Sequence, residues 1–253
     1  MKQKVLITGA SVGIGRHTAI RFAKAGAWVV VNYNKAEDDA RETLRLVEEA
    51  GGKGWILQAD IADENAADKL VKEAAGLMGG LDVLVNNAGI TRFIPFSDLD
   101  AVTGEVWDIL YRTNVESVFF CSRAAAKIMK AQKDGGSIIN LASAAGMLPI
   151  GSSIPYCVSK AAIIHLTKCL AREFAPLIRV NAVSPGVIQN TRWNSTNPAF
   201  NLENYQAGAK NIPLQKLGNP DDVAEGIFFL ASNEAGYITG TNLPVEGGVN
   251  VRV

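Results

Sequence analysis

Residues Val5 to Gly15 read VLITGASVGIG, and this segment indicates the class of fold. Its apolar start predicts a short buried strand, which is followed by a loop containing Gly9 and Gly13 and then by a helical pattern. Glycines let the backbone turn sharply and approach a pyrophosphate closely. The helix that follows directs its free N–H groups and the positive end of its dipole at such an anion. Strand, glycine loop and helix in this order predict a dinucleotide site rather than a plain tight turn.

Outward from this loop, short apolar runs alternate with longer helical stretches along the chain. Most of the runs lack polar alternation, as parallel strands covered on both faces do. We therefore predict an α/β fold over residues 1–253, a single-domain Rossmann-type doubly wound parallel sheet of about seven strands with helices on both faces. The expected strands are 5–7, 28–31, 55–57, 81–85, 137–141, 178–183 and 242–245, and the expected helices are 14–25, 36–50, 64–78, 103–130, 154–175 and 221–231.

Composition and charge exclude several functional classes. Lys and Arg together number 25, as do Asp and Glu, so the formal net charge is zero and no field attracts nucleic acid or an anionic membrane. The three cysteines are too few and too scattered for a disulfide framework, and no Cys/His cluster indicates a metal site. The first apolar run stops at Gly9, too early for a signal peptide or a membrane span. We expect a cytoplasmic protein without a metal, a nucleic-acid partner or a membrane partner.

The spacing of the glycines carries a resemblance to a known family. The pattern Gly-x-x-x-Gly-x-Gly differs from the Gly-x-Gly-x-x-Gly of ordinary NAD-binding domains. It resembles the compact, single-domain branch of the short-chain dehydrogenase/reductase family, and ordered matches extend over nearly the whole chain. The resemblance implies that the cofactor is contacted by Gly9, Ser11, Gly13, Ile14, Gly15, Asp60, Ile61, Asn87, Ala88, Gly89, Tyr156, Lys160, Pro185, Gly186, Ile188 and Thr191.

Four polar residues match the catalytic core of that family: Asn114, Ser143, Tyr156 and Lys160. Tyr156 and Lys160 are four residues apart and share a helix face. The pKa of a free tyrosine is about 10, and a nearby ammonium lowers it, so we expect Lys160 to activate Tyr156. The resemblance implies that Asn114 holds a water in a proton relay. Together with a hydrogen bond from Ser143 to the substrate oxygen, these groups predict hydride transfer at a C–O centre, with Tyr156 as general acid/base.

The end of the second strand bears on the choice of cofactor. NAD enzymes of this fold usually place a carboxylate there to bind the ribose 2′-hydroxyl. We expect Asn32 to occupy that place without repelling a 2′-phosphate, and Lys35 to neutralise the phosphate. This pattern favours NADP, with NAD as the alternative because Val12 stands where NADP-dependent relatives often carry a basic residue.

The substrate pocket of this family lies between the 143–155 loop, the irregular 189–215 segment and the end of the chain. The length of the 189–215 segment predicts a substrate lid. Ile150 is expected on an apolar wall, which could also include Met147, Leu148 and Ile154, and Trp193 is expected on the lid. The chain resembles both 3-oxoacyl-carrier-protein reductases and sugar or polyol dehydrogenases, so the substrate is expected to be a small carbonyl or alcohol. The resemblance also implies a homotetramer with two-fold axes.

Three other functions are weighed against ketone–alcohol interconversion. A non-catalytic NADP-sensing regulator on the same fold tends to lose the tyrosine or the lysine, and both are present. An enoyl reductase, which reduces a C=C bond, has a longer tyrosine–lysine spacing. A nucleotide-sugar epimerase usually has a longer chain than 253 residues.

Overall fold

The apolar run before the glycine loop forms β1 (Lys4–Ile7), a central strand of a seven-stranded sheet in the computed structural model, which describes residues 2–192 and 206–251. The strands pair in parallel in the order β3-β2-β1-β4-β5-β6-β7. The chain adds β2 and β3 on one side of β1 and then β4 to β7 on the other side, so the strand order switches between β1 and β4. In this fold a crevice opens at that switch, at the carboxyl ends of the strands. The predicted doubly wound fold is confirmed. The remaining strands are β2 (Trp28–Tyr33), β3 (Lys53–Gln58), β4 (Val83–Asn86), β5 (Gly136–Leu141), β6 (Ile178–Pro185) and β7 (Asn242–Val245).

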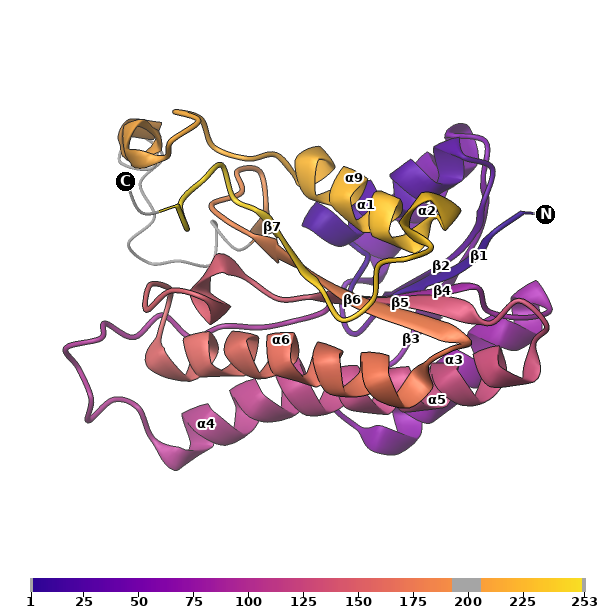
Figure 1. Ribbon diagram of the computed structural model, residues 1–253, viewed down its shortest axis with the longest axis horizontal. Coiled ribbons are helices and arrows are strands. Elements are labelled where there is room, and N and C mark those ends of the chain that lie inside the picture. The colour runs from indigo at the N-terminus through magenta and orange to yellow at the C-terminus, as the bar shows by residue number, and fades with distance from the viewer. Residues whose placement is uncertain (1, 193–205, 252–253) are drawn as a thin grey trace.

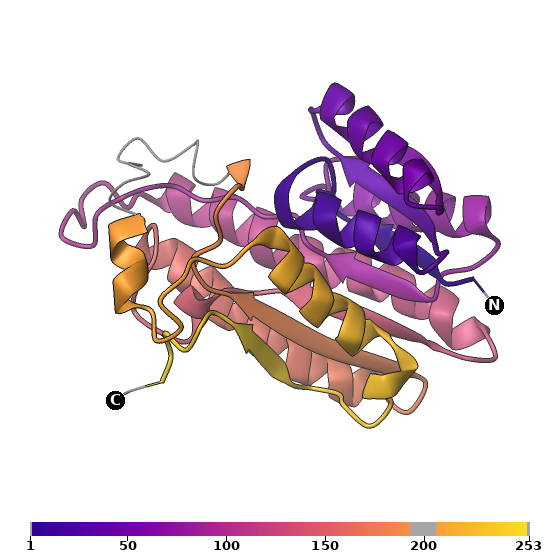
Figure 2. The same cartoon turned by 90° about the horizontal axis from the view of Figure 1, so that it is seen from above.

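Helices cover both faces of the sheet (Figure 1). One layer contains α1 (Gly13–Lys24), α2 (Glu37–Glu49) and α9 (Pro220–Ala231). The other contains α3 (Glu64–Met78), α5 (Ser117–Ala131) and α6 (Ile154–Phe174), with α4 (Gly104–Tyr111) leading into α5. In the view from above, α1 and α9 lie side by side over the sheet (Figure 2). No helix in the described part of the chain is long and apolar enough to cross a membrane.

The unbroken apolar character of the central strands follows from this double cover. Val5 and Ile7 belong to the hydrophobic core shared with α1 and α9, whereas Leu6 belongs to the core shared with α3 and α5. All three side chains are fully buried. Successive strand residues point to opposite faces, so both sets must be apolar when both faces are packed.

The expected helix over 103–130 is interrupted. Between α4 and α5 the chain makes a π-helical turn over Arg112–Glu116, with the fully buried Asn114 at its centre. The Asn114 side chain accepts a hydrogen bond from Ile90 N at 2.8 Å and donates to Ile90 O at 3.0 Å. Helical periodicity continues through the segment, so the pattern could not reveal the extra residue in the turn. Such π-turns occur frequently at functional sites.

Candidate active site

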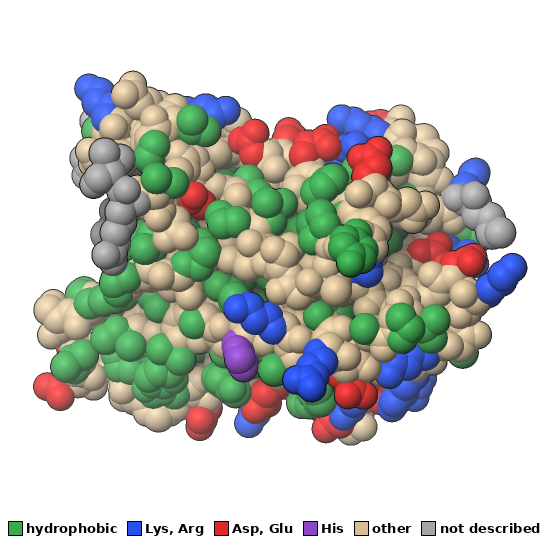
Figure 3. All heavy atoms as spheres, viewed as in Figure 1, with side chains coloured by type: hydrophobic (Ala, Val, Ile, Leu, Met, Phe, Trp, Pro, Cys, Tyr) green, Lys and Arg blue, Asp and Glu red, His purple; other side chains and the backbone are tan. Residues whose placement is uncertain are grey.

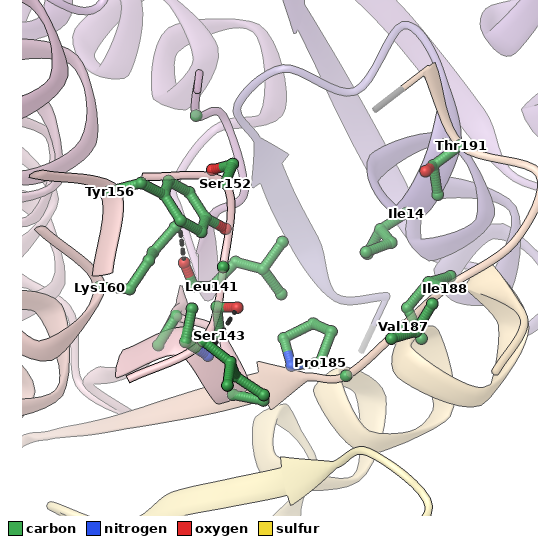
Figure 4. A pocket seen from close by; sticks show the side chains of 18 of the residues that line it. Ile14, Leu141, Ser143, Ser152, Tyr156, Lys160, Pro185, Val187, Ile188 and Thr191 are labelled. Atoms are coloured by element: carbon green, nitrogen blue, oxygen red, sulfur yellow. Dashed lines mark hydrogen bonds between the residues drawn. The ribbon is translucent and has the colours of Figure 1, made fainter. Parts of the chain in front are cut away.

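A cavity of about 810 Å³ lies at the carboxyl ends of the central strands (Figure 4). Gly13 and Ile14 line one side of it, and Tyr156 and Lys160 line the other. In the close-up, Thr191 and Ile188 lie on the same side as Ile14, across the cavity from the Tyr156 ring. The cavity therefore joins the glycine loop to the predicted catalytic residues.

The glycine loop has the backbone that an anion cradle needs. Gly9 and Gly13 have φ angles of 59° and 58°, in the left-handed region where side chains are strained. A Cβ on Gly15 would lie 2.6 Å from Asn87 Nδ2 and 2.8 Å from Gly9 O. Val12 stands at the N-cap of α1 and provides no side-chain cap, so the first-turn N–H groups remain available to an anionic ligand.

Two side chains hold this loop in shape from opposite sides. Asn87 Nδ2 donates to Thr8 O and Gly9 O, both at 2.9 Å. Arg16, to which the sequence analysis gave no role, donates from Nη2 to Ser11 O at 2.7 Å and from Nε to the α2 residue Thr43 at 2.8 Å. These hydrogen bonds to the carbonyls of Thr8, Gly9 and Ser11 fix the backbone path of the glycine loop.

The structure corrects the expectation for Asn32. Its side chain is 2% exposed and does not line the cavity. The Oδ1 atom accepts from Gly9 N at 3.2 Å, and Nδ2 donates to Leu57 O and Ala59 O, both at 3.2 Å. Asn32 thus ties the glycine loop to β3, because its amide is consumed by backbone groups. Lys35 is exposed beyond the end of β2.

Tyr156 and Lys160 lie in the first turns of α6, whose N-cap is Ser153. They are 8% and 4% exposed. Lys160 Nζ donates to Leu141 O at 2.9 Å and lies 5.7 Å from the centre of the Tyr156 ring. The Tyr156 hydroxyl hydrogen-bonds with Ser143, at the carboxyl end of β5. The structure thus brings together three of the four residues that were predicted to form the catalytic core, namely Ser143, Tyr156 and Lys160.

Burial is the main influence on the pKa values of Lys160 and Tyr156. It lowers the pKa of Lys160 to about 8, and it raises the pKa of Tyr156 above the usual range, with the Ser143 hydrogen bond acting in the opposite direction. The expected lowering of the Tyr156 pKa is therefore not found. The Lys160 ammonium is directed at Leu141 O beneath the ring, so it does not offset the loss of solvent around the hydroxyl. Tyr156 is therefore protonated at neutral pH, which is the form that a general acid needs, but its raised pKa makes it a weaker acid than a free tyrosine.

Asn114 and Lys160 both lie against Gly89. A Cβ on Gly89 would lie 3.3 Å from Asn114 Oδ1, a tight contact, and 3.5 Å from Lys160 Nζ, an ordinary one. The Asn114 amide also donates to Ser159 Oγ at 3.1 Å. Because its side chain is occupied by protein groups, the predicted water relay through Asn114 stays a prediction.

The other predicted cofactor residues divide into two groups. Asn87, Pro185, Gly186, Ile188 and Thr191 line the cavity together with Gly13, Ile14 and Gly89. Asp60 and Ile61 follow β3 outside the cavity lining: Asp60 is exposed and accepts from Ala62 N at 3.1 Å, and Ile61 is 6% exposed. Ala88 lies against Gly9, where a Cβ on the glycine would approach it to 2.8 Å.

Much of the substrate side of the cavity was not predicted from the sequence. Phe93, Ile94, Pro95 and Phe96 form a wall there, and Val249 comes to it from the end of the chain. The available signal was the apolar run that begins at Phe93, shortly after the Asn-Asn-Ala-Gly motif ends at Gly89.

The predicted substrate-side residues have different outcomes. Of the four apolar candidates in the 143–155 loop only Ile150 lines the cavity, and Met147 instead places its sulfur 3.1 Å from Asn242 Nδ2. Trp193 and the centre of the predicted lid lie outside the described residues.

The start of the predicted lid segment crosses toward α2. Ile188 pairs with Gly218 in an isolated parallel bridge, and Thr191 lies next to Gly13. Arg192 forms an ion pair with Asp39 in the first turn of α2, which also lies 3.8 Å from Arg16. The segment therefore borders the glycine loop as well as the catalytic side.

Comparison with known proteins agrees with this geometry over almost the whole chain. Residues 9–250 match the model of a family described as enoyl-(acyl carrier protein) reductase. A 3β-hydroxysteroid dehydrogenase 1 of Eggerthella lenta is 41% identical over 98% of this chain and 93% of its own length. A 3-oxoacyl-[acyl-carrier-protein] reductase of Staphylococcus aureus is 38% identical over 98% of each. A solved short chain dehydrogenase of Burkholderia cenocepacia, in complex with NADP, superposes with a TM-score of 0.88 at 36% identity, covering 98% of each chain. The chain belongs to the short-chain dehydrogenase/reductase family.

As a short-chain dehydrogenase/reductase, the protein is an oxidoreductase, and its cavity fits the nicotinamide dinucleotide that this family implies. The uncapped start of α1 and the left-handed glycines offer N–H groups and close backbone approach to a pyrophosphate. Among the residues that the structure describes, no group of three His, Cys, Asp or Glu side chains comes together as a metal site would require.

Proposed function

We propose that this short-chain dehydrogenase/reductase interconverts a ketone and a secondary alcohol with NADP, with Tyr156 as the general acid/base. The observation that supports it most is the meeting of Ser143, Tyr156 and Lys160 in one cavity with the glycine loop. A strongly perturbed lysine and tyrosine in a cleft are typical of a catalytic site.

The residues divide the work of ketone reduction. The bound nicotinamide supplies the hydride that reaches the carbonyl carbon. Ser143 and Tyr156 donate hydrogen bonds to the carbonyl oxygen, and Tyr156 then transfers its proton to that oxygen. The Lys160 ammonium, 5.7 Å from the ring centre, stabilises the phenolate that remains. In alcohol oxidation the roles of proton donor and acceptor reverse.

The proposed cofactor contacts follow the cavity. The loop residues Gly9, Ser11, Gly13, Ile14 and Gly15 would hold the pyrophosphate at the start of α1. Asn87, Ala88 and Gly89 would border the cofactor on the other side of the loop, and Pro185, Gly186, Ile188 and Thr191 would border the nicotinamide. Tyr156 and Lys160 would contact the nicotinamide ribose.

NADP is proposed over NAD because β2 ends without a carboxylate. Tyr33, Asn34 and Lys35 follow one another there, and Lys35 is exposed and free to approach a 2′-phosphate. The Burkholderia cenocepacia relative is solved with NADP. We expect kcat/KM to be at least about tenfold higher for NADPH than for NADH, and Lys35→Glu to reduce that ratio. Equal values for both cofactors would refute the proposal for Lys35.

Reduction of a C=C bond is the second candidate, because the matching family model carries the enoyl reductase description. The four-residue spacing of Tyr156 and Lys160 favours the carbonyl. A cyclic enone separates the two reactions, since it offers both bonds to one cofactor. With NADPH that carries deuterium as its transferable hydride, we expect an allylic alcohol with deuterium on the carbinol carbon. A saturated ketone with deuterium on the former alkene carbon would establish the enoyl reaction instead.

A regulator that binds NADP without turnover is less well supported, because the complete Ser143, Tyr156 and Lys160 group is assembled. It predicts tight NADPH binding with no product from any carbonyl in a broad panel.

A further inference from the structure

The substrate side of the cavity is lined by hydrocarbon. Phe93, Ile94, Pro95 and Phe96 follow β4, Ile150 follows β5, and Val249 lies near the end of the chain. The first of these segments is held in place, because Ile94 N donates to Ser152 O at 2.8 Å and the Thr91 hydroxyl bonds to the Ser152 hydroxyl. The wall is therefore formed before the substrate arrives, which reduces the entropy lost on binding.

The charges that border the cavity are already engaged. Among the described residues that line it, Lys160 and Arg192 are the only charged ones. Lys160 is directed at Leu141 O below Tyr156, and Arg192 is paired with Asp39 beside the glycine loop. The sequence of residues 193–205 contains no Lys or Arg. A carboxylate or phosphate placed against the wall would lose its water without gaining a counter-charge there.

Four polar side chains of the lining, Ser143, Tyr156, Ser152 and Asn87, are also engaged. Ser143 and Tyr156 are required at the reacting oxygen, and the Ser152 hydroxyl is bonded to Thr91. The Asn87 amide donates both to Thr8 O and to Gly9 O. A polyol would have to give up hydrogen bonds to water that the described lining does not replace, and each unpaired buried hydroxyl is costly.

We infer that the substrate of this short-chain dehydrogenase/reductase is an uncharged ketone with an apolar carbon skeleton. The inference rests on the proposed function. It separates this cavity from sites for sugars, polyols and substrates that bring an anionic group next to the ketone. The carbonyl is held by Ser143 and Tyr156, and the skeleton is recognised by burial against the wall.

A matched pair of cyclohexanones tests this inference. One carries a tert-butyl group opposite the carbonyl, and the other carries a carboxylate at the same position. With the full-length protein and NADPH, we expect kcat/KM for the tert-butyl ketone to be at least about a hundredfold higher than for the carboxylate. A ketose and acetoacetyl-coenzyme A are assayed in parallel, and both are expected to be poorer than the tert-butyl ketone.

A charge placed on the wall should reverse part of the preference. Ile150 is 47% exposed at the rim, so Ile150→Lys should fold, and it should raise kcat/KM for the carboxylate ketone relative to the tert-butyl ketone by at least about tenfold. Leu77→Lys is the matched control, because Leu77 is 41% exposed on α3, outside the cavity lining. That control should leave the ratio unchanged.

Failure of the inference and failure of the proposed function give different results. Equal or faster reduction of the carboxylate ketone, the ketose or the coenzyme A thioester would overturn the apolar substrate class while leaving ketone reduction intact. A ratio that moves equally in Ile150→Lys and Leu77→Lys would also overturn it. No reduction of any of the four ketones would instead count against the proposed function.

Discussion

Lys160 combines a cost in stability with a use in catalysis. Its side chain is 4% exposed, and burial alone lowers its pKa to about 8. The folded protein thus binds this proton less tightly than the unfolded chain does, and the difference is a penalty on the folded state wherever the lysine is charged. The charged Lys160 side chain therefore lowers the stability of the folded state. Its position beside Tyr156 accounts for its presence.

Activity should depend on the charge of Lys160. Below about pH 8 the ammonium is present, and above it the charge is lost, so kcat/KM for NADPH should fall about tenfold for each further pH unit. The direction follows from the lowered pKa, because an ordinary lysine would stay charged to about pH 10. Initial rates with a saturating ketone across this range measure the profile.

Lys160→Arg provides the control for that profile, because a guanidinium keeps its charge throughout the range. Its residual activity should lack the fall near pH 8. A wild-type profile that stays flat well above pH 8, or an unchanged fall in Lys160→Arg, would show that Lys160 is not the group that titrates.

At the level of elements, the start of α1 is fitted against the end of β4. A Cβ on Gly15 would come within 2.8 Å of Ala10 Cα and Gly9 O, and within 2.6 Å of Asn87 Nδ2. Backbone atoms cannot withdraw as a flexible side chain can. The close packing of α1 against the glycine loop and Asn87, which we call the seam, therefore requires glycine at position 15.

Gly15→Ala should destabilise the fold by about 2 kcal/mol and weaken NADPH binding, because the glycine loop and Asn87 must separate. Urea unfolding and fluorescence titration with NADPH measure the two effects. Gly76→Ala on α3 is the matched control, since a Cβ there meets nothing within 4 Å. It should stabilise the protein by up to about 1 kcal/mol through helix propensity. Equal behaviour of the two variants would contradict the proposed seam.

The sequence predicted the strands and most of the helices because apolar patterning and turn residues act locally. It could not reveal the π-turn at Asn114, since one extra residue in a turn leaves the apolar period nearly unchanged. From the sequence, Asn32 was assigned to the cofactor only because it lies near the end of a strand. Its orientation is in fact determined by three backbone groups of other segments, Gly9 N, Leu57 O and Ala59 O. The Phe93 wall also depends on tertiary contacts, here with Ser152.

The proton-transfer residues could be placed from spacing, but their electrostatics could not. Four residues of helix are enough to put Tyr156 and Lys160 on one face. The direction of the Tyr156 pKa depends on burial, which arises from the complete packing around α6. A local charge argument alone therefore gave the wrong direction.

On the scale of the whole molecule, one surface of the helical layer is unusually apolar. Trp107 and Tyr111 of α4, Phe119 of α5 and Val158 of α6 are 36%, 43%, 39% and 44% exposed. Apolar side chains gather on the visible surface over α4 and the first turns of α6 (Figure 3). Exposed apolar patches of this kind are typical of subunit contacts.

The predicted homotetramer should use this surface. We expect light scattering after gel filtration to give a tetramer mass for the wild type and a smaller assembly for Phe119→Glu, because a carboxylate would be buried in the contact. Leu77→Glu, on the exposed side of α3, should leave the mass unchanged. A wild-type monomer would rule out the assembly.

Tyr156→Phe is the sharpest test of proton transfer by Tyr156, because it removes one oxygen and keeps the ring that lines the cavity. Steady-state reduction of a ketone and equilibrium binding of NADPH are measured on the same preparation. We predict that kcat falls by about a thousandfold while the Kd for NADPH changes less than about threefold. Turnover at the wild-type rate in Tyr156→Phe would contradict the assignment of proton transfer to this residue.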